Sequence, residues 1–104
     1  MQKVKLFVSI DGGKEVKWKA NIKLVFWEHE KKIVVKGLEQ DTTSQDDLGT
    51  GSIDVASLKE SGTLEIHLKL KDKEMGTVKC KYNLKNLPPT PVLVISNILC
   101  DFLR

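Results

Sequence analysis

The sequence predicts an all-β protein, an antiparallel β-sandwich of seven to eight strands. Apolar and polar residues alternate with a period of two over most of the chain, which is the pattern of strands that bury one face. Short turn segments separate these runs at the spacing typical of sandwiches. The 104 residues are enough for one domain with a single modest core.

The first half of the chain supplies four expected strands. Residues 3–10 alternate cleanly and lead through the Asp-Gly-Gly-Lys turn at 11–14 into a second alternating run at 15–22. Because glycine supplies the positive φ that a tight turn needs, these two runs are expected to form a hairpin. A third strand is expected over 23–30 and a fourth over 31–38.

The second half supplies three more alternating runs. We expect strands over 51–58, 63–71 and 77–84, the last two joined by a turn at 72–76. Helix is expected only as a single turn near 56–58.

A proline-rich stretch divides the chain near its end. Proline fixes φ and removes a backbone donor, so residues 88–91 are expected to form a stiff extended linker. The sandwich is then expected over 1–87 and an apolar tail over 92–104. Within the tail, 92–95 resembles a strand and 97–104 is left open. The apolar stretch is too short to span a bilayer.

The net charge of +3 is unevenly distributed along the chain. Residues 1–36 carry nine lysines against four acidic residues, whereas residues 37–60 carry one lysine against six acidic residues. A basic body with an acidic segment suits an acidic surface better than sequence-specific recognition of nucleic acid.

The cysteines and the start of the chain indicate the compartment. Cys80 and Cys100 are too few for a disulfide framework, and they occur in no metal-binding spacing. Residues 1–3 run directly into the first expected strand, so no signal peptide is expected. We therefore expect a cytoplasmic protein, kept in a reducing compartment and peripheral to membranes.

The segment 39–49 gathers four acidic and three hydroxyl residues, and Leu48 is its one bulky apolar side chain. Crowded carboxylates repel one another unless a cation or a basic partner neutralises them. The segment is therefore expected to be a loop that holds calcium or, alternatively, a solvated acidic turn. The candidate metal ligands are Glu39, Asp41, Asp46 and Asp47.

Taken in order, these features resemble the C2 domain. The resemblance covers roughly residues 3–87, and its motifs are the hairpin at 4–22, the strand and loop at 34–41, the acids Asp46 and Asp47, the run at 52–55 and the closing strand at 75–82. It implies an eight-stranded β-sandwich that docks on phospholipids, often through calcium, with no cofactor required.

The chain departs from the family pattern at its beginning. The family's first strand and first calcium loop, which supply two of the usual aspartate ligands, have no counterpart before Lys3. Because calcium takes about six to eight oxygens, any calcium binding by the remaining loop is expected to be weak. The strand-like residues Val92 and Val94 either fill the vacant strand position or pair with a partner chain, since sheet edges are rarely left bare.

Lysines alternate outward on the two strands of the first hairpin. Lys3, Lys5, Lys17 and Lys19 are expected to share one face with Phe7. Such a cluster binds an anionic membrane with about 1 kcal/mol per basic residue. In the C2 family the lysine-rich strand binds phosphoinositides. The alternative is that these lysines simply solvate the face.

The remaining aromatic and titratable residues give no sign of catalysis. Trp18 shares a face with Val16, Ala20 and Ile22 and is expected in the core. Trp27 is out of phase with its apolar neighbours and is either a core residue or an exposed docking anchor. His29 and His67 have no nucleophile in a triad arrangement and are expected at the surface. No catalytic residue and no enzymatic activity are expected.

The sequence as a whole favours a non-enzymatic C2-like module that binds anionic phospholipid membranes, with calcium unnecessary or weakly bound. The alternative is a structural subunit whose sandwich docks on other proteins in a larger assembly. The lysines of the first hairpin favour the first function, and the partner-docking candidates Trp27, Val92 and Val94 favour the second.

Overall fold

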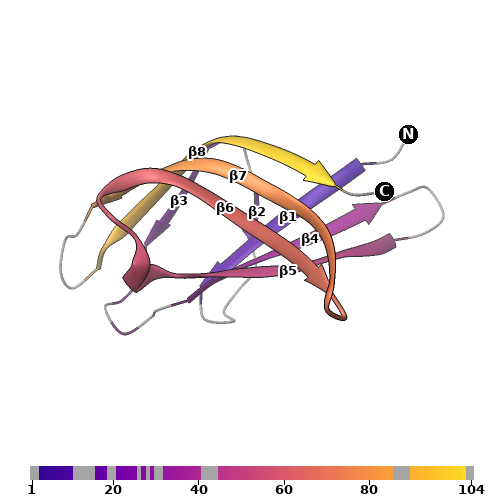
Figure 1. Cartoon of the computed structure of the whole chain (residues 1–104). Coiled ribbons are helices and arrows are strands. Elements are labelled where there is room, and N and C mark those ends of the chain that lie inside the picture. The colour runs from indigo at the N-terminus through magenta and orange to yellow at the C-terminus, as the bar shows by residue number, and fades with distance from the viewer. Residues whose placement is uncertain are drawn as a thin grey trace.

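The computed structural model describes residues 3–10, 16–18, 21–25, 27, 29, 32–40, 45–85 and 90–102. Nearly all of them lie in strands (Figure 1). The elements are β1 (Lys3–Ile10), β2 (Val16–Lys17), β3 (Ile22–Val25), β4 (Lys32–Gln40), β5 (Gln45–Asp54), the 3-10 turn η1 (Val55–Ser57), β6 (Ser61–Leu70), β7 (Lys73–Lys85) and β8 (Val92–Phe102). The predicted helical turn near residue 56 is confirmed, and η1 is the one helical element in the ranges just given.

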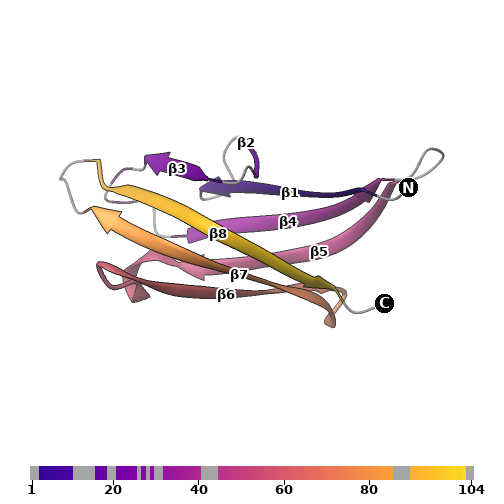
Figure 2. The ribbon, with the colours of Figure 1, turned by 90° about the horizontal axis from the view of Figure 1, so that it is seen from above.

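The strands form one antiparallel sheet in the order β2-β1-β4-β5-β6-β7-β8-β3. The prediction of an all-β antiparallel fold is confirmed. The described strands number eight with β2, which has only two residues, and seven without it, so the predicted seven to eight strands are found. A sandwich has two separate sheets, whereas here a single sheet curls strongly into a half-barrel (Figure 2). Alternation in a sequence indicates which residues share a face, but it does not show where a sheet bends or ends.

The core lies on the concave face of the curled sheet. Inward residues of strands that lie far apart in the sheet order meet there, and each is removed almost completely from water. The largest fully buried side chains are Val8, Ile33, Val35, Ile66, Leu68, Val78, Leu93 and Ile95. Because full burial of such a side chain stabilises by about 1.5–3 kcal/mol, the curl of the sheet is the main source of stability.

β5 and β6 approach each other closely at one point. These neighbours share a single paired position, Thr50 with Lys69, although each strand has ten residues. Glycines stand on both sides of Thr50. Gly49 has a φ of +96°, and a Cβ on Gly51 would lie 2.5 Å from the carbonyl oxygen of His67. Only glycine allows two backbones to approach so closely.

The two edges of the sheet are joined by a short piece of chain. β2 lies at one edge and β3 at the other, yet Lys17 and Ile22 are only five residues apart. Since extended chain spans at most about 3.6 Å per residue, these edges lie within about 18 Å of each other. Between them Trp18 is buried in the core, as predicted, and its backbone N–H donates to the Leu6 carbonyl at 2.6 Å.

The structure corrects two of the predicted elements and assigns one segment that the sequence left open. The run at 15–22 is not one strand, because β2 pairs with β1 whereas β3 pairs with β8 at the opposite edge. The segment 39–49 is not a loop, because β4 continues to Gln40 and β5 begins at Gln45. The end of the chain, left open in the sequence, is a strand as far as Phe102. In each case long-range strand pairing decides the structure, and local composition does not.

The glycine contact between β5 and β6 gives a first prediction. Gly51→Ala should lower the free energy of unfolding by more than about 2 kcal/mol, because the added Cβ would meet backbone of β6. Gly62→Ala is the matched control, since its Cβ would lie 3.4 Å from the Tyr82 ring, an ordinary contact. Its effect should stay within about 1 kcal/mol. Urea unfolding measures both, and similar losses in the two variants would contradict the proposed close approach.

Candidate functional site

The first candidate surface lies on the outward side of β2, β1 and β4, opposite the buried Leu6 and Val8. Phe7 pairs with Lys17 on one side and with Lys36 on the other, so the three side chains form a row across three strands. Lys5 precedes Phe7 by two residues and shares its face. We call Lys5, Phe7, Lys17 and Lys36 the lysine face.

The charge around the lysine face differs between its rows. Lys5 stands opposite Leu38, and the other partner of Leu38 is the exposed, outward Asp47. Lys17 is exposed, and the other members of the face are partly exposed. The row Lys17–Phe7–Lys36 continues across the sheet to Thr50 and then to Lys69, so it meets no carboxylate before it reaches β7. Two other lysines predicted for this face cannot be placed on it, because the side chain of Lys3 and all of Lys19 lie outside the described residues.

The acidic residues predicted to bind a metal do not converge within the described part of the chain. Glu39 and Asp46 are cross-strand partners on the inward side, where Glu39 is buried and Asp46 is exposed. Asp47 pairs with Leu38 on the outward side, and its Oδ1 accepts a hydrogen bond from the Gly49 N–H at 2.7 Å. Asp41 lies outside the described residues. No group of three potential ligands suited to a metal occurs in the ranges described.

The predicted docking residues lie near one another at the β3 edge. Val92 pairs with Val25, and Val94 pairs with Lys23, so β8 continues the sheet of its own chain here. Val25 is 55% exposed, and Trp27, two residues further along the chain, is 53% exposed. We call Val25, Trp27, Val92 and Val94 the β3 patch. Lys23 borders it on β3, which gives an apolar surface with a basic margin.

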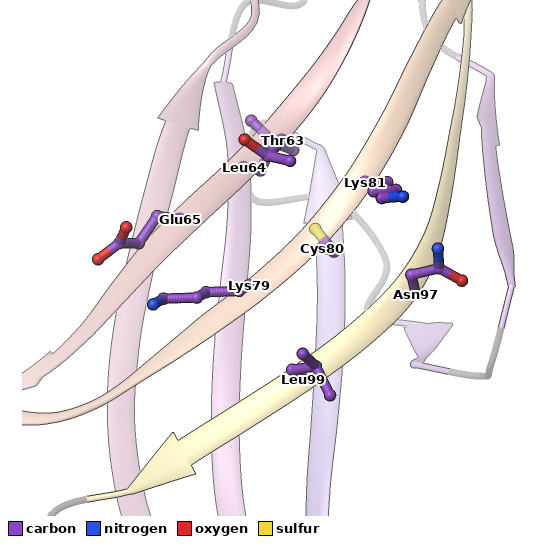
Figure 3. Close-up of a pocket in the computed structure, with 8 residues that line it drawn as sticks. All are labelled: Thr63, Leu64, Glu65, Lys79, Cys80, Lys81, Asn97 and Leu99. Carbon is purple, nitrogen blue, oxygen red and sulfur yellow. The ribbon is translucent and has the colours of Figure 1, made fainter.

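A groove that sequence reasoning missed crosses the outward face of β6, β7 and β8 (Figure 3). It has a volume of about 500 Å³ and is lined by Thr63, Leu64, Glu65, Lys79, Cys80, Lys81, Asn97 and Leu99. Leu99 is 70% exposed. The alternation of β7 could have revealed the two lysines in the sequence. Leu99 could not have been placed, because the end of the chain gave no clear strand pattern.

A histidine between two carboxylates lies on the same outward face. His67 Nδ1 is 2.6 Å from Glu74 Oε1, and its Nε2 is 3.4 Å from Glu65 Oε1. All three side chains are about half exposed. Cys80 is among the residues that line the groove, but its side chain is buried, so this group has no accessible thiol. It is an ion-pair cluster when His67 is protonated.

The two thiols differ in access to solvent. Burial, together with the smaller effect of the nearby Cys100, raises the pKa of Cys80 to about 11. Burial also raises the pKa of Cys100, although this residue is exposed. Neither thiol is bonded to another. Since the thiolate is the reactive form, neither cysteine has the lowered pKa of a catalytic nucleophile.

Comparison with known proteins gives no family assignment. No protein-family model matches the chain, and no curated protein or solved structure matches it significantly. The likeness to C2 domains therefore remains a prediction from sequence motifs. Among the residues described, no helix has the length and apolar character needed to cross a bilayer.

The placement of the acidic residues gives a second prediction. With Asp47 on the opposite face from Glu39 and Asp46, calcium at 1 mM should raise the free energy of unfolding by at most about 1.5 kcal/mol. Thermal unfolding with calcium and with a chelator measures the effect. The variant Asp46→Asn with Asp47→Asn is the control. A micromolar dissociation constant by calorimetry, lost in this variant, would contradict the prediction.

The difference between the thiols gives a third prediction. At pH 8, iodoacetamide should modify Cys100 well before Cys80, which is buried and whose pKa lies about three units above that pH. Alkylation of Cys80 in the folded protein should keep accelerating with pH until about pH 11, since its thiolate fraction rises over that range. In the variant Cys100→Ser, mass spectrometry measures the alkylation rate of Cys80 alone. Rapid alkylation of that variant at pH 8 would contradict the burial of Cys80.

Proposed function

We propose that this chain is a non-enzymatic, C2-like module that binds anionic membrane surfaces through its lysine face. The observation that carries this proposal is the cross-strand row of Lys17, Phe7 and Lys36 on the outward side of the sheet. A ring flanked by two ammonium groups combines an apolar contact with charge neutralisation, which is the chemistry that an anionic phospholipid surface accepts.

The expected strength of this contact is modest. At about 1 kcal/mol per basic residue near an anionic leaflet, Lys17 and Lys36 together supply about 2 kcal/mol. Binding by one copy should therefore be reversible and should weaken as salt screens the charges over a Debye length of about 8–10 Å. The net charge of +3 over the whole chain also favours attraction to an anionic membrane.

The proposed binding does not need calcium. A calcium bridge between protein and lipid requires several carboxylates aimed at one point. The described candidates Glu39, Asp46 and Asp47 are divided between the two faces of the β4–β5 hairpin. The lysine face carries its positive charge without a metal.

A second candidate function is that of a structural subunit that docks on another protein. The β3 patch favours it, because Val25 and Trp27 are large apolar side chains left about half exposed at a sheet edge. Exposed apolar surface with a polar margin is typical of protein interfaces. Under this function, Trp27→Ser should abolish assembly and leave vesicle binding unchanged.

The membrane proposal gives a fourth prediction. Lys17→Glu with Lys36→Glu should abolish cosedimentation with phosphatidylcholine vesicles that contain phosphatidylserine, because two attractive charges become repulsive. Pure phosphatidylcholine vesicles should bind neither protein. The fold should survive, since a surface substitution typically costs less than about 0.5 kcal/mol.

The matched control is Lys79→Glu with Lys81→Glu, which changes the net charge equally on β7. This control should retain most of the binding. Equal losses in the two double variants would mean that overall charge, and not the lysine face, attracts the membrane. Absence of binding by the unaltered chain would refute the proposed function.

A further inference from the structure

The second half of β8 leaves one side of the strand open. β3 pairs with β8 only as far as Ile95, and beyond that position none of the described strands lies against the side of β8 that faces away from β7 (Figure 2). Residues 97–102 therefore present backbone N–H and C=O groups along a sheet edge that begins with an irregularity at Asn97, whose φ is 53°. Such an edge is a template for another strand.

Side chains near this edge are also incompletely covered. Cys100 pairs with the fully buried Val78 and so lies on the inward side, yet it is exposed. Ile98 and Phe102 pack against the core and are only partly buried. On the outward side Leu99 is 70% exposed. An added strand would cover apolar atoms on both faces.

The sequence along the edge is symmetric in polarity about Leu99. It reads Asn, Ile, Leu, Cys, Asp over residues 97–101, with polar residues at both ends and apolar residues between them. Asp101 carries the only formal charge of this stretch. A two-fold axis at Leu99 would therefore oppose Asp101 to Asn97 and Ile98 to Cys100.

We propose that two copies of this chain pair antiparallel along residues 97–101 of β8, with the two-fold axis at Leu99. Such an isologous contact uses the same edge on both copies and closes with two. The Asn97 amide of each copy donates to the Asp101 carboxylate of the other, and the two Leu99 side chains pack together outward. The inference does not depend on membrane binding, because it uses no residue of the lysine face.

Competing registers are unfavourable. An axis at Asp101 would oppose two carboxylates, which repel. An axis at Cys100 would set Asp101 against Leu99 and leave its carboxylate without a polar partner. An axis moved toward the start of the strand would run into β3, which occupies the edge as far as Ile95. Leu99 is thus the best centre for the pairing.

The test is the oligomeric state over a concentration series, measured by light scattering coupled to size exclusion. The unaltered chain should approach twice 11.7 kDa as concentration rises. Leu99→Arg should stay monomeric, because the pairing would bring two like charges together at the axis. Val25→Arg, the same change at an exposed apolar residue of β3, is the matched control and should still dimerise.

A crosslinking experiment tests the register independently. In a Cys100→Ser background, Leu99→Cys should give a covalent dimer with oxidised glutathione, since directly opposed strand residues lie within disulfide distance. Val25→Cys in the same background should not. A chain that is monomeric at every concentration would overturn the proposal, as would a dimer lost in Val25→Arg and kept in Leu99→Arg. Failure of Leu99→Cys to crosslink would rule out this register.

Discussion

The close approach of β5 to β6 is the constraint on which the rest of this fold depends. An ordinary antiparallel pair is held by a ladder, whereas here the two strands share one paired position, Thr50 with Lys69. Gly49 and Gly51 remove the side chains that would hold the backbones apart. Because the sheet can turn at this point, β1 and β4 come to face β7 and β8 across a common core. A flatter sheet would leave its apolar face in water and could not be stable.

The register that fills the core also determines the candidate surfaces. Once Leu6 and Val8 point inward, Lys5 and Phe7 must point outward, since successive strand residues alternate between the two faces. The outward position of these residues of the lysine face therefore follows from the strand alternation alone. Register shifts between β4 and β5, β6 and β7, and β7 and β8 alter this simple rule, because an extra residue changes which side chains stand opposite each other. Asn97, with a φ of 53°, lies at the last of them.

Much of the strand content could be predicted from alternation, but the arrangement of the strands could not. The first strand, the burial of Trp18 and the outward lysines follow from a period of two. Local pattern gave no sign that 15–22 is divided between two sheet edges, because each part obeys the same alternation. The residues 45–47 are polar and charged, yet they pair with β4. The groove beside Leu99 is formed by three neighbouring strands, β6, β7 and β8. It could not be predicted, because the pattern of one segment does not show which strands lie next to it.

The proposed dimer and the proposed membrane contact would reinforce each other. Lys17 and Lys36 of one lysine face are worth about 2 kcal/mol, which alone gives only transient attachment. A dimer carries two such faces, and a second face that reaches the same membrane binds at a high effective concentration. Thermodynamic linkage then requires the membrane to favour the dimer by the same factor by which dimerisation favours membrane binding. The β8 edge and the lysine face belong to different strands, so the two contacts use different residues and can form at the same time. Anionic vesicles should therefore strengthen dimerisation of the unaltered chain more than that of Lys17→Glu with Lys36→Glu.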